Sequence, residues 1–231
     1  MIRPDLRARV LSAALAVEAA SDELCRLDAV AGDGDHGVTM TLGARAVRTR
    51  LEAAPAATGA DLVTQVALGM GSIGGAIGPI WASGLLKVAA ALRAADAGAA
   101  GATGVTVGEL RSLGEAFEGA IVTLGHAARG DKTILDAVGP AVDALRQAER
   151  AGTPVEDAVA LAVRAADEGA RSTAGLVASV GRASRLGERS RGSPDPGASS
   201  FALIVAAFAG APPAPEPPGS PGPAPTSGPE G

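Results

Sequence analysis

Three aspartates stand within eight residues of one another, in a run that also carries several glycines. Asp28, Asp33 and Asp35 belong to the run LDAVAGDGDHGVTM, in which the glycines leave the backbone free to bend. Carboxylates held this close repel one another unless a cation neutralises them. Mg²⁺ takes oxygen ligands of this kind and commonly shares them with a substrate phosphate. The run therefore predicts a site for a hard cation and a phosphate-bearing ligand.

Two other structures would account for the same run. A calcium loop of EF-hand type beginning at Asp33 would place Ala44 where the bidentate Glu is required, so this alternative is rejected. A solvated acidic turn needs no ligand, because Asp and Gly are the commonest turn residues. Taken alone, the run leaves the cation site and the solvated turn both open.

The composition of the 231-residue chain favours a single soluble helical domain. Ala and Leu dominate the apolar residues, aromatic residues make up 2% and Tyr is absent. The formal net charge is −5 and the basic residues form no patch, so nucleic acid is not expected as a partner. Cys25 is the one cysteine, which excludes an intramolecular disulfide, and no apolar stretch is long enough to span a membrane. We expect a cytoplasmic protein without a membrane partner.

Apolar spacing and breaks at Gly or Pro predict eight helices and no sheet. The first is expected from about Pro4 to Cys25. Its buried face is expected to carry Leu6, Val10, Leu11, Leu15 and Val17. The other helices are expected at about 38–53, 59–70, 79–95, 107–127, 132–150, 154–178 and 197–209. Residues 201–208 would also suit a buried strand.

The chain is expected to divide into a helical domain over residues 1–210 and a tail over residues 211–231. From Ala211 onward it reads APPAPEPPGSPGPAPTSGPEG. Proline removes amide donors, and this stretch has nothing large to bury. A disordered, proline-rich tail is therefore predicted.

Three further segments, 69–86, 125–141 and 181–200, interrupt the predicted helices with glycine and polar residues. The first leads into a helix start, where free amides could bind a phosphate. The second sets Asp131 and Lys132 at a helix start, and the third is rich in Arg. Close helix crossing, a solvated lysine and an exposed basic loop are the structural alternatives. If the segments meet the aspartate run on one rim of a helical bundle, all four would form one ligand site.

Four motifs taken together, GDGDHG, GGAIGP, GDKTILDAVGPA and GRASRLGERS followed by DPGAS, closely resemble those of the DhaL family. This family, also called Dak2, comprises the nucleotide-binding subunits of bacterial dihydroxyacetone kinases. The resemblance runs from about residue 4 to residue 210. It implies an all-α, eight-helix barrel with the nucleotide at one end, which agrees with the helix count above.

The resemblance also implies a set of ligand-binding residues. Asp28, Asp33 and Asp35 match the aspartates that bind two Mg²⁺ ions, which bridge the phosphates of ADP or ATP. The nucleotide pocket is implied to contain His36, Gly37, Val38, Thr39, Ala76, Ile77, Gly125, Ile134, Arg182, Asp195, Pro196 and Gly197. His36 is implied as a nucleotide contact, not a general base, and His126 has no counterpart. No catalytic residue is implied on this chain beyond the metal site.

Some positions depart from the family's pattern. Family members usually have Ser where Ile77 stands, Asn where Thr39 stands and Tyr where Arg185 stands, and Ser193-Pro194 interrupts the GH that precedes DPGA. The missing hydroxyl at position 77 removes a possible phosphate hydrogen bond worth about 1.5–3 kcal/mol. The amide of Ile77 can still donate. The departures leave the metal site intact and leave the nucleotide affinity and the ketose open.

Phosphoryl transfer asks mainly for positioning and charge neutralisation, which this chain could supply. The resemblance implies that the ketose is held by a histidine of a separate DhaK subunit, so that the chain alone is inactive. The favoured version depends on phosphoenolpyruvate: bound ADP is rephosphorylated by a phosphohistidine protein of DhaM type and passes the phosphate to dihydroxyacetone. The alternatives are an ATP-dependent kinase for a related ketose such as erythrulose, and a nucleotide-loaded binding module that signals to a regulator. A homodimer is expected.

Overall fold

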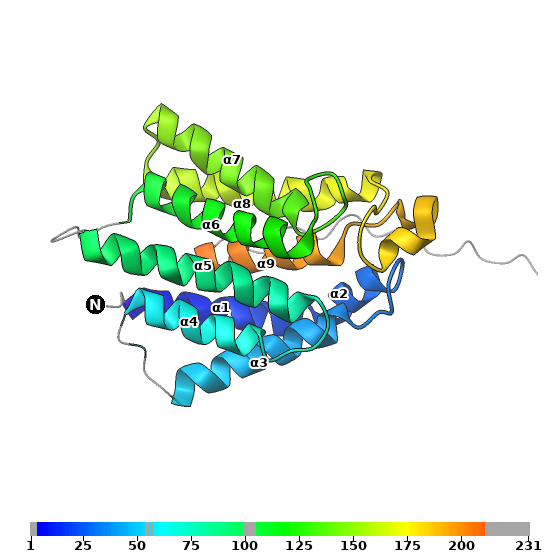
Figure 1. Ribbon diagram of the computed structural model, residues 1–231, viewed down its shortest axis with the longest axis horizontal. Coiled ribbons are helices and arrows are strands. Elements are labelled where there is room, and N and C mark those ends of the chain that lie inside the picture. The colour runs from blue at the N-terminus through cyan, green and yellow to red at the C-terminus, as the bar shows by residue number, and fades with distance from the viewer. Residues whose placement is uncertain (1–3, 54–55, 57, 99–104, 211–231) are drawn as a thin grey trace, which may run out of the picture.

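The computed structural model describes residues 4–53, 56, 58–98 and 105–210, and every regular element in this part of the chain is a helix (Figure 1). The α-helices are α1 (Pro4–Ala19), α2 (Ser21–Asp28), α3 (His36–Ala53), α4 (Gly59–Met70), α5 (Ile77–Gly98), α6 (Val107–Gly125), α7 (Leu135–Ala151), α8 (Val155–Ser172) and α9 (Pro196–Ala209). Two 3₁₀ helices, η1 (Thr173–Gly175) and η2 (Ala183–Ser190), lie between α8 and α9. The predicted all-α class is confirmed, and the strand considered for residues 201–208 is helical. The predicted tail, 211–231, lies outside the described residues.

The first predicted helix is in fact two helices, α1 and α2, which meet at Ala20. The amide of Ala20 still donates to the carbonyl of Ala16, and the amide of Leu24 donates to that of Ala20, both at 3.0 Å. Because the hydrogen-bond ladder crosses the junction, the break is a kink in one rod. The described residues therefore form nine α-helices, and eight rods when α1 and α2 are taken together.

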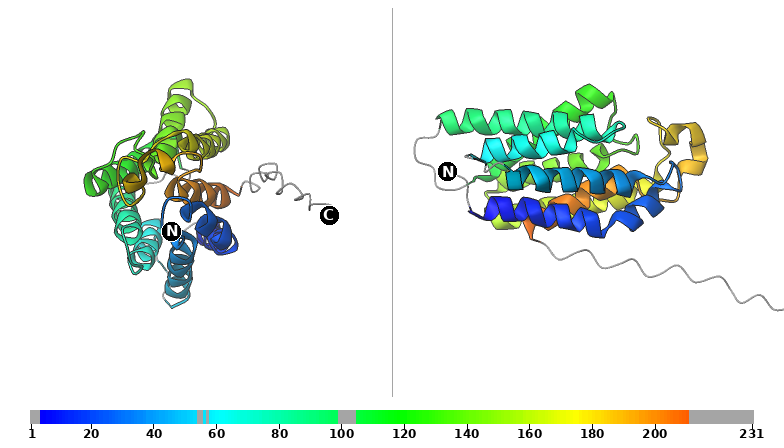
Figure 2. Two further views of the ribbon diagram at one scale, coloured as in Figure 1. Left: turned by 90° about the vertical axis from the view of Figure 1, so that its right-hand side faces the viewer. Right: turned by 90° about the horizontal axis from the view of Figure 1, so that it is seen from below.

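The helices close into a ring. Along the chain, each helix from α3 to α8 packs against the next one, and α1 packs against both α3 and α9. The left view of Figure 2 looks along the ring from one end. This is the predicted helical barrel, and its two ends are made of the connections between helices.

The barrel interior is filled by apolar side chains, among them three of the chain's few aromatic residues. Trp81 of α5 lies 5.4 Å from Phe117 of α6 and 6.1 Å from Phe201 of α9, measured between ring centroids. Edge-to-face and tilted pairs at such distances add to the stability gained by burial. The aromatic cluster therefore packs α5, α6 and α9 against one another inside the barrel.

One residue expected in the core is exposed. Leu15 is 53% exposed, whereas Ala14 and Val17 are 6% and 3% exposed. A helix turns 100° per residue, so the residue after Ala14 leaves the narrow stripe that α1 buries against its neighbours. The prediction for Val17 is confirmed, Leu6, Val10 and Leu11 are partly buried, and the prediction for Leu15 is wrong.

The four glycine-bearing connections meet at one end of the barrel. The connections α2–α3, α4–α5, α6–α7 and α8–α9 all lie at the right-hand end of Figure 1, and the right view of Figure 2 agrees. We call this the loop end. Within the part of the chain that the structure describes, no helix is long and apolar enough to cross a membrane.

Candidate metal and nucleotide site

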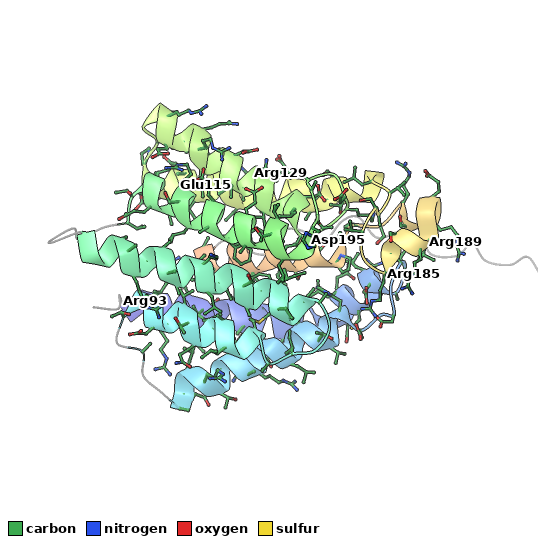
Figure 3. All side chains as sticks on the ribbon, viewed as in Figure 1. Arg93, Glu115, Arg129, Arg185, Arg189 and Asp195 are labelled. Atoms are coloured by element: carbon green, nitrogen blue, oxygen red, sulfur yellow. The ribbon has the colours of Figure 1, made fainter. Side chains whose placement is uncertain are left out.

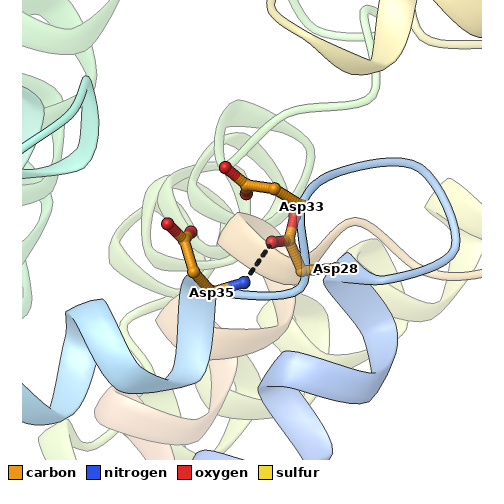
Figure 4. Close-up of side chains that lie close together, drawn as sticks. All are labelled: Asp28, Asp33 and Asp35. Carbon is orange, nitrogen blue, oxygen red and sulfur yellow. Dashed lines mark hydrogen bonds between the residues drawn. The ribbon is translucent and has the colours of Figure 1, made fainter.

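The three aspartates predicted to bind a cation converge at the loop end (Figure 4). One carboxylate oxygen from each of Asp28, Asp33 and Asp35 lies within 4.8 Å of the others. Asp28 is the last residue of α2, and Asp35 immediately precedes α3. Asp28 Oδ2 accepts hydrogen bonds from the amides of Asp35 at 3.0 Å and His36 at 3.3 Å. Asp28 therefore holds the loop as well as contributing to the cluster.

Two glycines allow this loop to close over Asp28. Gly34 has a φ of +75°, which L side chains rarely adopt. At Gly32 a Cβ would lie 2.1 Å from Asp28 Oδ1. A side chain at residue 32 would displace the Asp28 carboxylate from this position.

A guanidinium from the α8–α9 connection reaches the cluster. Arg182 forms an ion pair with Asp33 through Nη1, and its Nη2 lies 3.8 Å from Asp35 Oδ1. Loss of water would raise the pKa of Asp33, but the hydrogen bond and charge of Arg182 leave that pKa below its ordinary value. Loss of water and the charge of Asp33 raise the pKa of Asp35. The cluster thus has a negative potential that draws a cation.

Magnesium fits this set of donors. All three are hard carboxylate oxygens, two of the three side chains are exposed, and they leave room for water and phosphate ligands. The residues therefore fit the predicted metal.

His36 is buried and neutral. Burial is the main reason that its pKa is lowered to about 4, and its Nε2 lies 3.1 Å from Ser200 Oγ. The Ser200 hydroxyl also donates to the carbonyl of Gly197 at 3.0 Å. The bond between His36 and Ser200 links the start of α3 to the start of α9.

The loop before α7 is held by two carboxylates. Asp131 accepts from the amide of Ala128 at 2.6 Å and from the hydroxyl of Ser179 at 2.5 Å. Asp136 accepts from the amides of Gly130 and Thr133. Lys132 itself has a φ of +61°, outside the right-handed helical region, so the helix expected from residue 132 begins only at Leu135.

Lys132 in this loop is 6% exposed, so the alternative of a solvated lysine is wrong. Its Nζ donates to the carbonyls of Thr173 at 2.7 Å and Ser193 at 2.6 Å. Loss of water lowers the pKa of Lys132, while the charge of Asp195 opposes this. The lysine is a buried connector between the second and third predicted segments.

The glycine-rich connection before α5 is open. A Cβ at Gly74 or Gly75 would have no neighbour within 4 Å, and Gly75 has a φ of +72°. Close helix crossing therefore does not explain these two glycines. At Gly78, by contrast, a Cβ would lie 2.4 Å from the carbonyl of Ile73, so this glycine is required by packing.

The chain matches the model of one protein family, the DAK2 domain, over residues 30–210. The protein belongs to the DAK2 domain family.

Several curated proteins resemble this DAK2 domain. It is 34% identical to the ADP-binding subunit DhaL of the PEP-dependent dihydroxyacetone kinase of Escherichia coli, covering 80% of this chain and 85% of that protein. It is 38% identical to a D-erythrulose kinase and 37% identical to an L-erythrulose 1-kinase, both of Mycolicibacterium smegmatis. Each of these matches covers 80% of this chain but only 31% and 32% of the kinase. The DAK2 domain thus spans about a third of the length of these erythrulose kinases.

Solved structures confirm the fold. The dihydroxyacetone kinase of C. freundii superposes with a TM-score of 0.69 at 22% identity, over 91% of this chain and 35% of that one. The same kinase in complex with AMP-PNP and Mg²⁺ gives a TM-score of 0.66 at 23% identity, over 91% and 34% of the two chains.

The residues predicted for the nucleotide pocket of the DAK2 domain all lie in or beside the four connections, but they differ in exposure. Val38 is 54% exposed and Ala76 is also exposed, whereas Gly125 and Pro196 are half-buried. Gly37, Ile134 and Gly197 are buried within the protein. The structure gives the positions of these residues, and their contacts with a nucleotide stay predictions.

Sequence reasoning missed several residues that hold the DAK2 domain's loop end together. Thr173 and Ser200 are fully buried hydroxyls that bridge connections, and Lys132 was singled out at a helix start without its burial being predicted. One signal could have found Lys132: it is one of only two lysines among the chain's 20 basic residues. Figure 3 shows Arg185 and Arg189 of η2 at the same end as Asp195.

Replacing Asp195 by asparagine should make the DAK2 domain less sensitive to alkaline pH. Asp195 caps α9 by accepting from the amide of Ala198 at 2.7 Å, and loss of water raises its pKa from 3.8 to about 7. Between these values the folded state binds more protons than the unfolded state. The stability contributed by this group is therefore full below pH 3.8 and is lost as the pH rises through 7.

Asparagine cannot ionise and caps a helix equally well. The Asp195→Asn variant should match the natural protein below pH 3.8, gain on it as the pH rises, and exceed it at pH 8 by on the order of 1–4 kcal/mol in unfolding free energy. Thermal melts across this pH range check the prediction. Parallel curves for the two proteins would contradict it.

Proposed function

We propose that this DAK2 domain is the nucleotide-binding subunit of a dihydroxyacetone kinase. The observation that carries the proposal is the convergence of three carboxylates, Asp28, Asp33 and Asp35, with a guanidinium at an end of the barrel built from glycine-rich connections. The likeness to E. coli DhaL over 85% of that protein supports it. The domain division proposed is a nucleotide-binding domain over 1–210 and a tail over 211–231.

In this proposal the three aspartates bind two Mg²⁺ ions, and the predicted pocket residues bind ADP or ATP. Bound Mg²⁺ would neutralise the charge of the nucleotide phosphates. The protein's own part is to hold the carboxylates together, to offer the open amides around Gly75 to phosphate oxygens, and to supply the positive charge of Arg182. No nucleophile on this chain is needed for in-line transfer from a positioned nucleotide.

Because the ketose must be held elsewhere, we propose a DhaK-type partner subunit, without which the chain is inactive. We favour the version in which bound ADP is rephosphorylated by a DhaM-type phosphohistidine protein, because relatives of similar length are named as ADP-binding subunits of PEP-dependent dihydroxyacetone kinases. We also propose that two copies of the chain form a homodimer.

An ATP-dependent kinase acting on erythrulose is the second candidate. It is favoured by the 38% and 37% identity to erythrulose kinases, which exceed the identity to E. coli DhaL. Those kinases are about three times as long as the matched region, so their substrates come to this chain only as a proposal.

Reconstitution tests both candidates. The purified chain is mixed with a DhaK-type subunit and either dihydroxyacetone or erythrulose, with excess ATP in one arm and a phosphohistidine relay supplied with phosphoenolpyruvate in the other. Phosphorylated dihydroxyacetone only in the relay arm is the expected result. Phosphorylated erythrulose in the ATP arm would favour the second candidate. Nucleotide binding without transfer in any arm would leave a signalling module and contradict both kinase proposals.

A further inference from the structure

The position of Lys132 in this protein is unfavourable in free energy. The other lysine of the chain, Lys87, is exposed on α5, and the remaining basic residues are arginines. Lys132 is 6% exposed and has a φ of +61°, in the left-handed region that residues other than glycine seldom adopt. Burial of an ammonium and a left-handed backbone both oppose folding. Such a residue persists where its contacts outweigh these costs.

The contacts of Lys132 close the neck of one loop. Its Nζ bridges the carbonyls of Thr173 and Ser193, at 2.7 and 2.6 Å, and these two residues flank the segment 174–192. At the same neck the amide of Asp195 donates to Thr173 Oγ1 at 2.7 Å. The amide of Gly192 donates to the carbonyl of Ala174 at 2.8 Å. The segment 174–192 therefore leaves and re-enters the barrel at one point.

The segment closed in this way carries Arg182 to the aspartate cluster. Arg182 pairs with Asp33 and lies beside Asp35. Before Arg182 in the segment, the hydroxyl of Ser179 donates a hydrogen bond to the carboxylate of Asp131. A lysine ammonium is compact and has three N–H donors, so it can bridge two carbonyls in a tight space. The planar fork of an arginine suits carboxylates instead.

We propose that Lys132 is a positioning residue, whose ammonium closes the neck of the segment 174–192 and so fixes where Arg182 meets the aspartate cluster. The consequence for ligands rests on the proposed function, because it assumes that a nucleotide binds at this cluster. The effect of Lys132 on the position of the segment 174–192 does not depend on the proposed function. This difference allows the two to be tested separately.

The first test uses the protein without nucleotide. Lys132→Met retains a long side chain and removes the ammonium, and Lys87→Met is the matched control. Hydrogen exchange, resolved by peptide, should become at least about tenfold faster over 176–192 in Lys132→Met and stay within about twofold in α3 to α6. Lys87→Met should leave both regions unchanged. Equal acceleration in all regions, or none over 176–192, would overturn the proposal.

The second test is a double-mutant cycle with Mg-ADP binding as the readout. Lys132→Met and Arg182→Ala should each weaken binding by about tenfold or more. If Lys132 acts through Arg182, the double variant should be no weaker than Arg182→Ala alone. Additive losses would overturn the proposal, because a general loss of structure adds to the loss of a contact. If the natural protein binds no Mg-ADP, the proposed function fails while hydrogen exchange still decides the role of Lys132.

Discussion

The Asp33→Asn variant is expected to lose the thermal stabilisation that Mg-ADP gives to the natural protein. A ligand at about 100 times its dissociation constant should raise the melting temperature of a domain of this size by roughly 5–10 °C. Asparagine retains the shape of the aspartate but not its negative charge, so the affinity for magnesium should fall about 100-fold or more. The remaining shift would then be about 1 °C. Differential scanning fluorimetry with and without Mg-ADP measures both shifts.

Asp33 is the best of the three aspartates for this experiment. Asp28 also binds the amides of Asp35 and His36, so its replacement would disturb the loop itself. Asp33 is exposed, and its side chain pairs with Arg182, which is exposed too. Exposed ion pairs contribute little to folding stability, so the variant should fold normally without ligand.

Asp61→Asn is a matched control for the loss of one exposed carboxylate. Asp61 lies 3.8 Å from Arg93, in the first turn of α4, and Figure 3 shows Arg93 at the end of the barrel away from Asp195. This variant should retain the full shift with Mg-ADP. Equal shifts in Asp33→Asn and the natural protein would refute the role given to Asp33. No shift in the natural protein would favour the solvated acidic turn.

The location of the site could be predicted because it follows from topology. In an up-and-down ring of helices, every second connection lies at the same end. The connections α2–α3, α4–α5, α6–α7 and α8–α9 are such alternate connections, so motifs far apart in sequence meet (Figure 1). The helices themselves were evident from long alanine-rich stretches interrupted by Gly and Pro, and η2 was the one described helix that no periodicity indicated.

The errors about Lys132 and Leu15 concern features that depend on contacts distant in sequence, whereas the error about α7 has a local cause. The start of α7 is set by the left-handed backbone of Lys132, whose φ of +61° lies outside the right-handed helical region. The burial of Lys132 is set by carbonyls 41 and 61 residues away along the chain. Leu15 was misplaced because α1 buries a narrow stripe, and the apolar spacing alone did not indicate its width. Local sequence patterns carry no information on such partners.

Replacing Gly37 by alanine should damage both the fold and the metal site. A Cβ on Gly37 would lie 1.8 Å from the carbonyl oxygen of Ser21 and 3.0 Å from the amide nitrogen of Cys25. Both neighbours are backbone atoms of α2, so they cannot move aside as a flexible side chain would. Alanine must therefore push α2 away from α3, at a cost of about 3 kcal/mol or more, or roughly 6–12 °C in melting temperature.

The same displacement should reach the aspartates, because α2 ends at Asp28 and α3 begins directly after Asp35. The Gly37→Ala variant is thus expected to lose the Mg-ADP shift together with its stability. Gly119→Ala is the matched control, since a Cβ at Gly119 on α6 would have no neighbour within 4 Å and should stabilise the helix by about 0.5–1 kcal/mol. Thermal melts of both variants with and without Mg-ADP make the comparison.

The experiment also separates two reasons for a glycine at position 37. The family resemblance implies that this residue contacts the nucleotide, whereas the structure places it against α2. If Gly37→Ala melts like the natural protein yet binds no Mg-ADP, the glycine serves the ligand and the packing argument is wrong. If stability and binding fall together, the close approach of α2 and α3 is what brings Asp28 to Asp35, and the absence of a side chain at residue 37 is a condition for the metal site.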